Sequence, residues 1–137
     1  MNNELPLRPA PIRKRDNLFF WDGAKLEELR IQKCNCCGKL QHPPGPMCPQ
    51  CLETDMGYQV CVGRGRVYSW IIPRYPELPM FSSDLVVALI ELEEGVRILS
   101  NICDVAHEDI RQGMEVELFF AATQDDGKVP QFRPATQ

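Results

Sequence analysis

Two C-x₂-C pairs constrain the fold of this chain more than any other feature. The pairs are Cys34/Cys37 and Cys48/Cys51, and residues 38–47 separate them. Two cysteines with this spacing can turn both sulfurs toward one point, and two such knuckles facing each other complete a tetrahedral site of four sulfurs. The segment is rich in proline and glycine and poor in large apolar side chains, so burial alone cannot hold it. We therefore expect a bound metal ion to stabilise this segment.

The donor set favours a structural Zn²⁺ bound by Cys34, Cys37, Cys48 and Cys51. Four thiolates fill the tetrahedral shell and leave no position open for water or substrate, so no catalysis is expected at the metal. Two alternatives stay open. The first is a rubredoxin-like iron, and the second is a disulfide or an accidental pattern.

The remaining cysteines and the two histidines show no sign of catalytic chemistry. Cys36 lies inside the first knuckle and could compete for register, whereas Cys61 and Cys103 fall in predicted strands and are expected to be small buried side chains. His42 and His107 are expected to be surface or capping residues. The sequence carries no Ser/His/Asp pattern, P-loop or dinucleotide fingerprint, which indicates a non-catalytic chain.

The chain after Met56 has a β pattern throughout. Alternating and apolar runs predict five strands at Tyr58–Val62, Arg66–Pro73, Leu85–Leu92, Val96–Cys103 and Glu115–Phe120. Glycines and prolines separate these runs, and Gly95 suits a hairpin turn between the third and fourth. A short helical crossing is predicted at Val105–Arg111. A five-stranded barrel of the OB type is the most economical arrangement of such strands.

The first part of the chain predicts an irregular arm at Leu5–Arg15, a helix at Asn17–Ala24 capped by Asp16, and a strand at Leu29–Lys33. The expected fold is mainly β, with an N-terminal helix and a rubredoxin-like zinc ribbon followed by a five-stranded OB-fold barrel. We divide it into 1–33 (arm, helix and first ribbon strand), 34–55 (zinc ribbon) and 56–137 (OB-fold domain with a C-terminal tail).

Length and charge exclude several classes of function. With 137 residues the chain is too short for a self-contained thiolase, dehydrogenase or barrel enzyme. Its net charge of −4 and pI near 5.2 oppose binding to nucleic acid, although basic residues outnumber acidic ones in residues 1–76. No signal peptide and no apolar run of membrane-spanning length is seen, so we expect a cytoplasmic protein, with its thiols reduced and no membrane association.

The order of the motifs resembles a known family. A helix with Phe19-Phe-Trp21 precedes the cysteine pairs, Gly63-x-Gly-x-Val67-Tyr-Ser69 and Glu91-Leu-x-Glu-Gly95-Val-Arg97 follow them, and Phe132-Arg-Pro134 ends the series. Over roughly Asn17 to Pro134, this order resembles the zinc-ribbon plus OB-fold accessory proteins of acyl-CoA metabolism. The chain departs from a common pattern of that family because Gly45-Pro46, and no arginine, follows Pro43-Pro44.

The resemblance implies an accessory subunit that pairs with a thiolase-superfamily enzyme, in a heterotetramer. Partners in the family include thiolases, hydroxymethylglutaryl-CoA synthase-type condensing enzymes and lipid-transfer-protein-like aldolases. The partner would make or break the carbon–carbon bond as an acyltransferase or aldolase. This chain would help to form the acyl-CoA channel and share acyl-CoA or CoA as a ligand.

Two groups of side chains are candidates for these contacts. Arg64, Arg66 and Arg74 lie beside two glycines and a proline-rich loop, where they could bind the CoA phosphates; alternatively, they are solvated or pair with the acidic second half. The proposed partner interface consists of large rings without a clear place in the core: Phe19, Phe20, Trp21, Tyr75, Phe81 and Phe132. The alternative for the first three rings is that they cover the chain's own core.

Two other functions stay open. The first is a nucleic-acid-binding zinc-ribbon/OB module, which the architecture permits. The acidic net charge of the chain argues against this function. The second open function is that of a rubredoxin-like electron carrier, which the red colour of an oxidised iron site would reveal.

Overall fold

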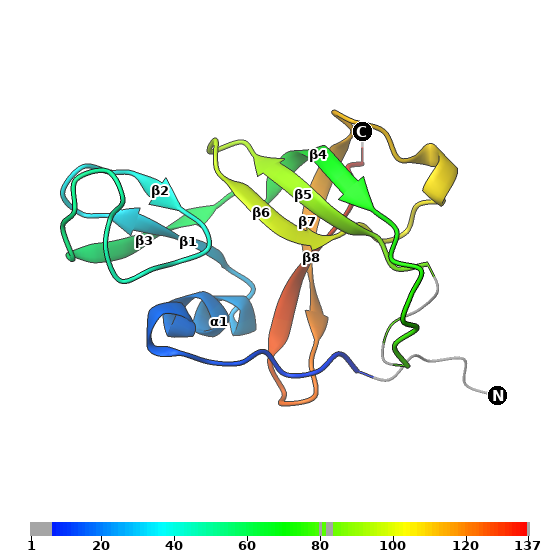
Figure 1. Cartoon of the computed structure of the whole chain (residues 1–137), viewed down its shortest axis with the longest axis horizontal. Helices are drawn as coiled ribbons and strands as arrows, with labels where there is room; N and C mark the ends of the chain where they lie inside the picture. The colour runs from blue at the N-terminus through cyan, green and yellow to red at the C-terminus, as the bar shows by residue number, and fades with distance from the viewer. Residues whose placement is uncertain (1–6, 80, 82–83, 137) are drawn as a thin grey trace.

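The computed structural model describes residues 7–79, 81 and 84–136, which form a small β ribbon and a larger curled sheet (Figure 1). The helix lies beneath the ribbon, and the arm runs from below the barrel to the start of the helix. Residues 5 and 6 of the predicted arm lie outside the described residues. The predicted fold class is confirmed: the described chain is mainly β, with an N-terminal helix, a four-cysteine ribbon and a five-stranded OB-like half-barrel.

The ribbon is an antiparallel sheet with the strand order β2-β1-β3. Its strands are β1 (Leu29–Cys34), β2 (Leu40–Gln41) and β3 (Met56–Cys61). The register of β1 with β3 runs from Leu29 opposite Cys61 to Cys34 opposite Met56. Assigning Tyr58–Val62 to the barrel was therefore wrong. Its alternation identifies a strand, but alternation does not say with which sheet a strand pairs.

The second sheet has the order β6-β5-β4-β7-β8 and is antiparallel throughout. Its strands are β4 (Arg64–Ile71), β5 (Val87–Leu92), β6 (Arg97–Asn101), β7 (Glu115–Ala122) and β8 (Lys128–Pro134). The predicted hairpin between β5 and β6 is confirmed, with Gly95 at φ 90°. An isolated bridge between Ile102 and Phe132 brings the two edges of the sheet together.

Sequence reasoning missed the two-residue strand β2 in the ribbon and the longer strand β8 in the barrel. β8 contains Pro130 and Pro134, and proline, which lacks a backbone N–H, argues against a central strand. The structure resolves the conflict because β8 lies at an edge of the sheet and pairs along its length only with β7. The predicted tail is thus part of the barrel.

The helix α1 spans Leu18–Lys25 and follows a short 3₁₀ turn at Arg15–Asn17. Asp16 lies inside that turn and does not cap the helix, so the predicted cap was wrong; the side-chain oxygen of Asn17 instead accepts a 2.7 Å hydrogen bond from the backbone N–H of Lys14. The predicted crossing contains a single 3₁₀ turn at His107–Asp109. No helix in the described residues is long and apolar enough to cross a membrane.

One hydrophobic core joins the helix, the ribbon and the barrel. Phe20 of α1 and Ile31 of β1 belong to the same buried cluster as Val67, Ile90 and Phe132 of the barrel. Gly63 makes the turn from β3 into β4 at φ 82°, and a Cβ atom there would lie 2.8 Å from Cβ of Leu118. The ribbon is therefore packed onto the barrel as part of one folded unit.

Candidate metal centre and interaction sites

The cysteine pairs lie in two tight turns at one end of the ribbon. Cys34 ends β1, and its backbone carbonyl accepts a 2.9 Å hydrogen bond from the N–H of Gly38, whose φ of 78° suits a residue without a side chain. The second turn repeats the arrangement, because the carbonyl of Cys48 accepts a 3.0 Å hydrogen bond from the N–H of Leu52. Both knuckles are thus built by local backbone hydrogen bonds.

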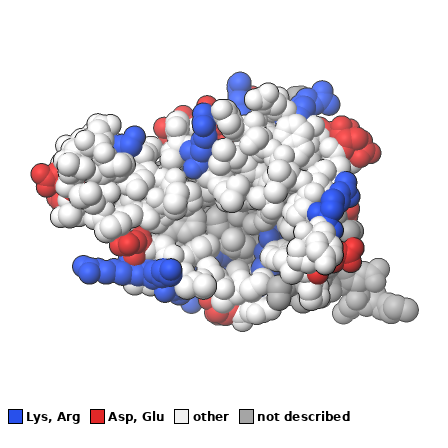
Figure 2. Space-filling view, in the orientation of Figure 1, with Lys and Arg blue, Asp and Glu red and all other residues white. Residues whose placement is uncertain are grey.

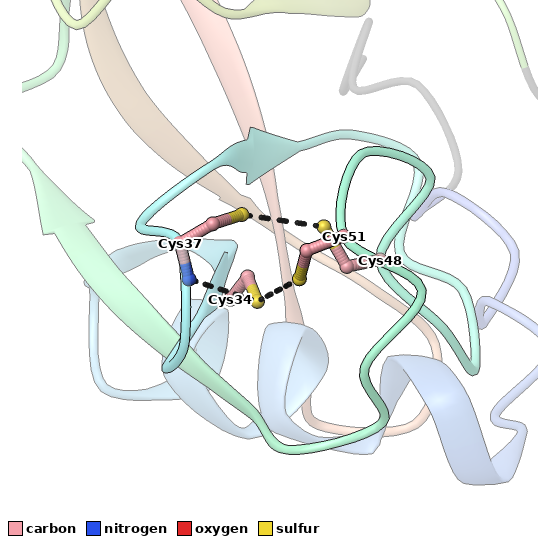
Figure 3. Close-up of side chains that lie close together, drawn as sticks. All are labelled: Cys34, Cys37, Cys48 and Cys51. Atoms are coloured by element: carbon pink, nitrogen blue, oxygen red, sulfur yellow. Dashed lines mark hydrogen bonds between the residues drawn. The ribbon is translucent and has the colours of Figure 1, made fainter.

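The four sulfurs converge on one point (Figure 3). The Sγ atoms of Cys34 and Cys51 are 3.5 Å apart, those of Cys37 and Cys48 are 3.6 Å apart, and all four lie within 4.8 Å of one another. A tetrahedron with metal–sulfur bonds of about 2.3 Å has sulfur–sulfur edges of about 3.8 Å, whereas a disulfide bond is about 2.05 Å long. The cluster fits a four-thiolate metal site and does not fit a pair of disulfides.

Backbone N–H groups favour the thiolate form of Cys34 and Cys48, whereas the pKa values of Cys37 and Cys51 are raised. The N–H of Cys37 points at the Sγ of Cys34 over 3.5 Å and lowers the pKa of that thiol to about 6. The N–H of Cys51 likewise lowers the pKa of Cys48. Cys36 is exposed, and its sulfur is not part of the four-sulfur cluster. The donor chemistry is consistent with structural zinc, and Cys36 does not replace Cys37.

Cys61, Cys103 and the two histidines lie outside the four-sulfur cluster. Burial raises the pKa of Cys61 to about 12 and also raises that of Cys103, which leaves both as neutral thiols. His42 packs against Phe20, with ring centroids 5.2 Å apart, and burial lowers its pKa to about 4. His107 contacts the carbonyl oxygen of Asp84 through Nε2 at 3.1 Å. His42 is thus a half-buried, neutral ring that packs against the helix.

The three candidate phosphate-binding arginines do not share one cavity. Arg64 and Arg66 project from β4 and line a cavity of about 380 Å³, while Arg74 lines a different one of about 430 Å³ beside the proline-rich loop. Arg66 pairs with Glu115 at 3.5 Å, and both side chains are largely exposed. The first cavity also contains Glu91 and Glu93. A phosphate group near Arg64 would therefore meet carboxylates as well.

The six candidate interface rings divide into three groups. Phe20 and Phe132 are 6% and 0% exposed, so they belong to the chain's own core and offer no surface to a partner. Phe19, Trp21 and Phe81 are half-buried, and Phe19 stacks on Tyr58 with ring centroids 5.9 Å apart. Tyr75 is 91% exposed. The partner interface proposed for these rings is thereby reduced to Phe19, Trp21, Tyr75 and Phe81.

Sequence reasoning missed Arg8, which the arm carries against the barrel. The backbone carbonyl of Arg8 accepts a 2.9 Å hydrogen bond from the N–H of Gln124, and its guanidinium donates to Oδ1 of Asn101 at 2.8 Å. Nothing in a proline-rich arm without periodicity indicates such a contact.

Comparison with known proteins matches the two parts of the chain separately. Residues 21–57 match the ChsH2 rubredoxin-like zinc ribbon domain, and residues 58–121 match the ChsH2 C-terminal OB-fold domain. The chain is 43% identical over 129 residues to a probable enoyl-CoA hydratase alpha subunit of Thermomonospora curvata. It is 42% identical over 106 residues to the 3-oxo-4,17-pregnadiene-20-carboxyl-CoA hydratase alpha subunit of Mycobacterium tuberculosis.

These matches cover 94% and 77% of this chain but only 40% and 34% of those two relatives, so the chain spans well under half their length. A shorter relative is the DUF35 domain-containing scaffold protein of Methanocaldococcus jannaschii, with 35% identity over 97 residues and 69% of each chain covered.

Solved structures agree with the sequence comparison. A chain of the Ltp2-ChsH2(DUF35) aldolase superposes with a TM-score of 0.88 at 41% identity, covering 93% of this chain and 100% of that one. A DUF35 family protein from Sulfolobus solfataricus, 16% identical, superposes with a TM-score of 0.63 over 88% of this chain and 86% of that one, and shows the fold alone. From its consecutive domain matches and its full coverage of a solved relative, the chain belongs to the ChsH2/DUF35 family of zinc-ribbon and OB-fold proteins.

Proposed function

We propose that this chain is a zinc-containing scaffold subunit of a thiolase-like acyl-CoA enzyme complex, in which a partner subunit makes or breaks the carbon–carbon bond. The observation that carries the proposal is the match, at 41% identity and over the full length of that chain, to a chain of the Ltp2-ChsH2(DUF35) aldolase. An aldolase-like partner follows most directly from that match, with a heterotetramer as the proposed assembly.

The four-cysteine cluster supports a structural role. Cys34, Cys37, Cys48 and Cys51 would hold Zn²⁺, which supplies a cross-link between the two knuckles when bound. The ribbon contributes Leu29 and Ile31 to the core that it shares with the barrel. By holding the two knuckles together, the zinc would therefore also stabilise the surface that the ribbon and the barrel offer to a partner.

The proline-rich loop after β4 is the surface that best fits partner contact. Tyr75 is 91% and Leu78 49% exposed, and Pro73, Pro76 and Pro79 restrict the loop that carries them. Rigid, exposed aromatic side chains make strong interface anchors because little conformational entropy is lost when they bind. Phe81 ends the same loop, while Phe19 and Trp21 would add contacts on the helix side.

The role in an acyl-CoA channel belongs to the same proposal. Arg74 lines a cavity with Pro73, Pro76 and Glu77, so a channel wall at the partner interface would carry a cation there, with one carboxylate nearby. An arginine at that place suits the phosphates of CoA, which this chain and its partner would bind together. Arg64 and Arg66 are weaker candidates because their cavity contains three carboxylates, those of Glu91, Glu93 and Glu115, whereas the cavity of Arg74 contains one, that of Glu77.

Complex formation tests the proposal. The purified chain is mixed with thiolase-superfamily proteins from its own source organism, and the mass of each mixture is measured by size-exclusion chromatography with light scattering. A stable heteromeric species with one of these proteins supports the proposal. If the chain elutes unchanged with every one of them, even in the presence of acyl-CoA, the scaffold assignment fails.

A further inference from the structure

A cavity of about 320 Å³ lies where the helix, the ribbon and the barrel meet. Its walls come from α1, from the Pro43-Pro44 segment of the ribbon and from strands β6 and β8. Figure 2 shows the surface hollowed between the α1 side of the molecule and the barrel, with Lys or Arg atoms visible inside the hollow. The volume lies at the lower end of the range for small-molecule sites, which is about 300–1,000 Å³.

The cavity has a single formal charge among the described residues that line it. That charge is the guanidinium of Arg8, and no aspartate or glutamate is present in the lining. His42 also lines the cavity but is neutral, because burial lowers its pKa to about 4. The cavity on the other side of Arg8 is different, since its lining includes Asp84, Asp104 and Glu108. An anion bound at Arg8 would meet no carboxylate in the cavity on the helix side, whereas three carboxylates line the other cavity.

The guanidinium of Arg8 is held in place without a carboxylate partner in the described part of the chain. It donates to Oδ1 of Asn101 at 2.8 Å and lies 5.3 Å from the ring centroid of Phe81, and none of the ion pairs of the described residues includes it. Its backbone is fixed by pairing with Thr123 and by the hydrogen bond from Gln124. A half-buried, preorganised guanidinium gains most from a bound carboxylate.

Much of the rest of the wall is apolar, and the rings of Phe20, Trp21 and three prolines form a large part of it. Trp21 meets Phe20 edge to face, with ring centroids 4.8 Å apart, and Pro43, Pro44 and Pro130 add flat apolar surfaces. The polar side chains of β6 and β8 are occupied inside the fold, because Ser100 and Gln131 both donate to the carbonyl oxygen of Pro130. Such a wall favours a flat apolar body over a polar one.

We propose that this cavity binds a small, flat, apolar carboxylic acid, with the carboxylate at Arg8 and the apolar body between Trp21 and the proline wall. Two ring nitrogens of the wall, Nε1 of Trp21 and Nδ1 of His42, are buried without a hydrogen-bond partner among the described residues. All residues that line the site belong to this chain, and Trp21 is shared with the proposed partner interface, so the test uses the chain without a partner.

Titration with a matched pair of probes tests the site. 2-Naphthoate and its neutral isostere 2-naphthamide share the same flat body and differ in charge. Each is added to the ¹⁵N-labelled, zinc-loaded chain while the two tryptophan indole N–H signals are followed by NMR. We expect 2-naphthoate to shift the Trp21 signal saturably and the Trp70 signal little, with 2-naphthamide bound about ten-fold more weakly.

Arginine variants assign the charge preference. Arg8→Gln should abolish the preference for the carboxylate, Arg8→Lys should retain part of it, and Arg111→Gln, which changes an exposed arginine outside the cavity lining, should leave it intact. Equal affinity for the two probes, no saturation up to about 10 mM, or an unchanged preference in a folded Arg8→Gln variant would each overturn the proposal. Even if Arg8→Gln does not fold, the affinities of the two probes for the unaltered chain show whether the cavity prefers the carboxylate.

Discussion

The backbone N–H of Cys103 donates a 2.8 Å hydrogen bond to the carbonyl oxygen of Phe132, joining the end of β6 to the last strand of the sheet. The Ser100 hydroxyl adds a second link across the same seam, a 2.9 Å bond to the carbonyl oxygen of Pro130. These bonds close the half-barrel over the ring of Phe132, which is fully buried. The C-terminal segment is therefore needed to complete the core.

Replacing Phe132 by alanine should lower the free energy of unfolding by about 3–5 kcal/mol, because a fully buried ring is lost and a cavity remains. Phe119→Ala is the matched control, since Phe119 lies in the adjacent strand but is half-buried, with the guanidinium of Arg133 5.1 Å from its ring centroid. Denaturant unfolding of both variants makes the comparison. Equal losses, or a loss below about 1 kcal/mol for Phe132→Ala, would contradict the closed core.

Each chain should bind about one zinc ion, through the four sulfurs that converge on one point. Cys34→Ser and Cys48→Ser should each reduce the zinc measured by elemental analysis and lower the melting temperature. Cys36→Ser is the matched control in the same knuckle, and it should keep full metal content because its sulfur lies outside the cluster. Iron in place of zinc would show that the metal assignment is wrong. Zinc loss in Cys36→Ser alone would show that the ligand assignment is wrong.

His42 should make the fold less stable in mild acid. Its pKa falls from the ordinary 6.5 to about 4 in the folded chain, so between these values the unfolded chain binds a proton that the folded chain does not. The free energy of unfolding therefore falls as the pH is lowered, by about 2 kcal/mol between pH 7 and pH 5 from this group.

His42→Leu should lose that part of the pH dependence. Effects of acid on the cysteine cluster and on carboxylates are common to both proteins, so the difference between their pH profiles isolates the imidazole. Denaturant unfolding at pH 7, 6 and 5 measures it. Parallel profiles for the two proteins would show that His42 is protonated equally well in the folded chain.

The proline-rich loop should anchor the partner. Tyr75→Ala combined with Phe81→Ala is expected to weaken heteromer formation by about 2 kcal/mol or more, because an exposed aromatic anchor and its half-buried neighbour are removed. Binding is measured by calorimetry, alongside zinc content and melting temperature, which should change little. A variant that melts much earlier yet binds normally when folded would place both rings in the chain's own packing.

The sequence predicted the local features well and the pairing of distant segments poorly. The cysteine knuckles and the hairpin at Gly95 follow from short-range spacing and turn chemistry. The assignment of β3 to the ribbon, the strand that contains Pro130, and the contact of Arg8 with the barrel all depend on partners far away in the chain. Alternation and proline content describe one segment at a time, so they cannot show which edge that segment meets.

Turnover measured with the two subunits separately and together tests the central claim most directly. The chain alone, the proposed thiolase-like partner alone and their mixture are each given 3-oxoacyl-CoA and 3-hydroxyacyl-CoA substrates, and the acyl-CoA products are separated and quantified. We expect no turnover by this chain alone, whose four-cysteine site has no open position for substrate, and full activity only in the mixture. Turnover by the isolated chain at the rate of the mixture, or a partner equally active without it, would contradict the account of this chain as a scaffold subunit.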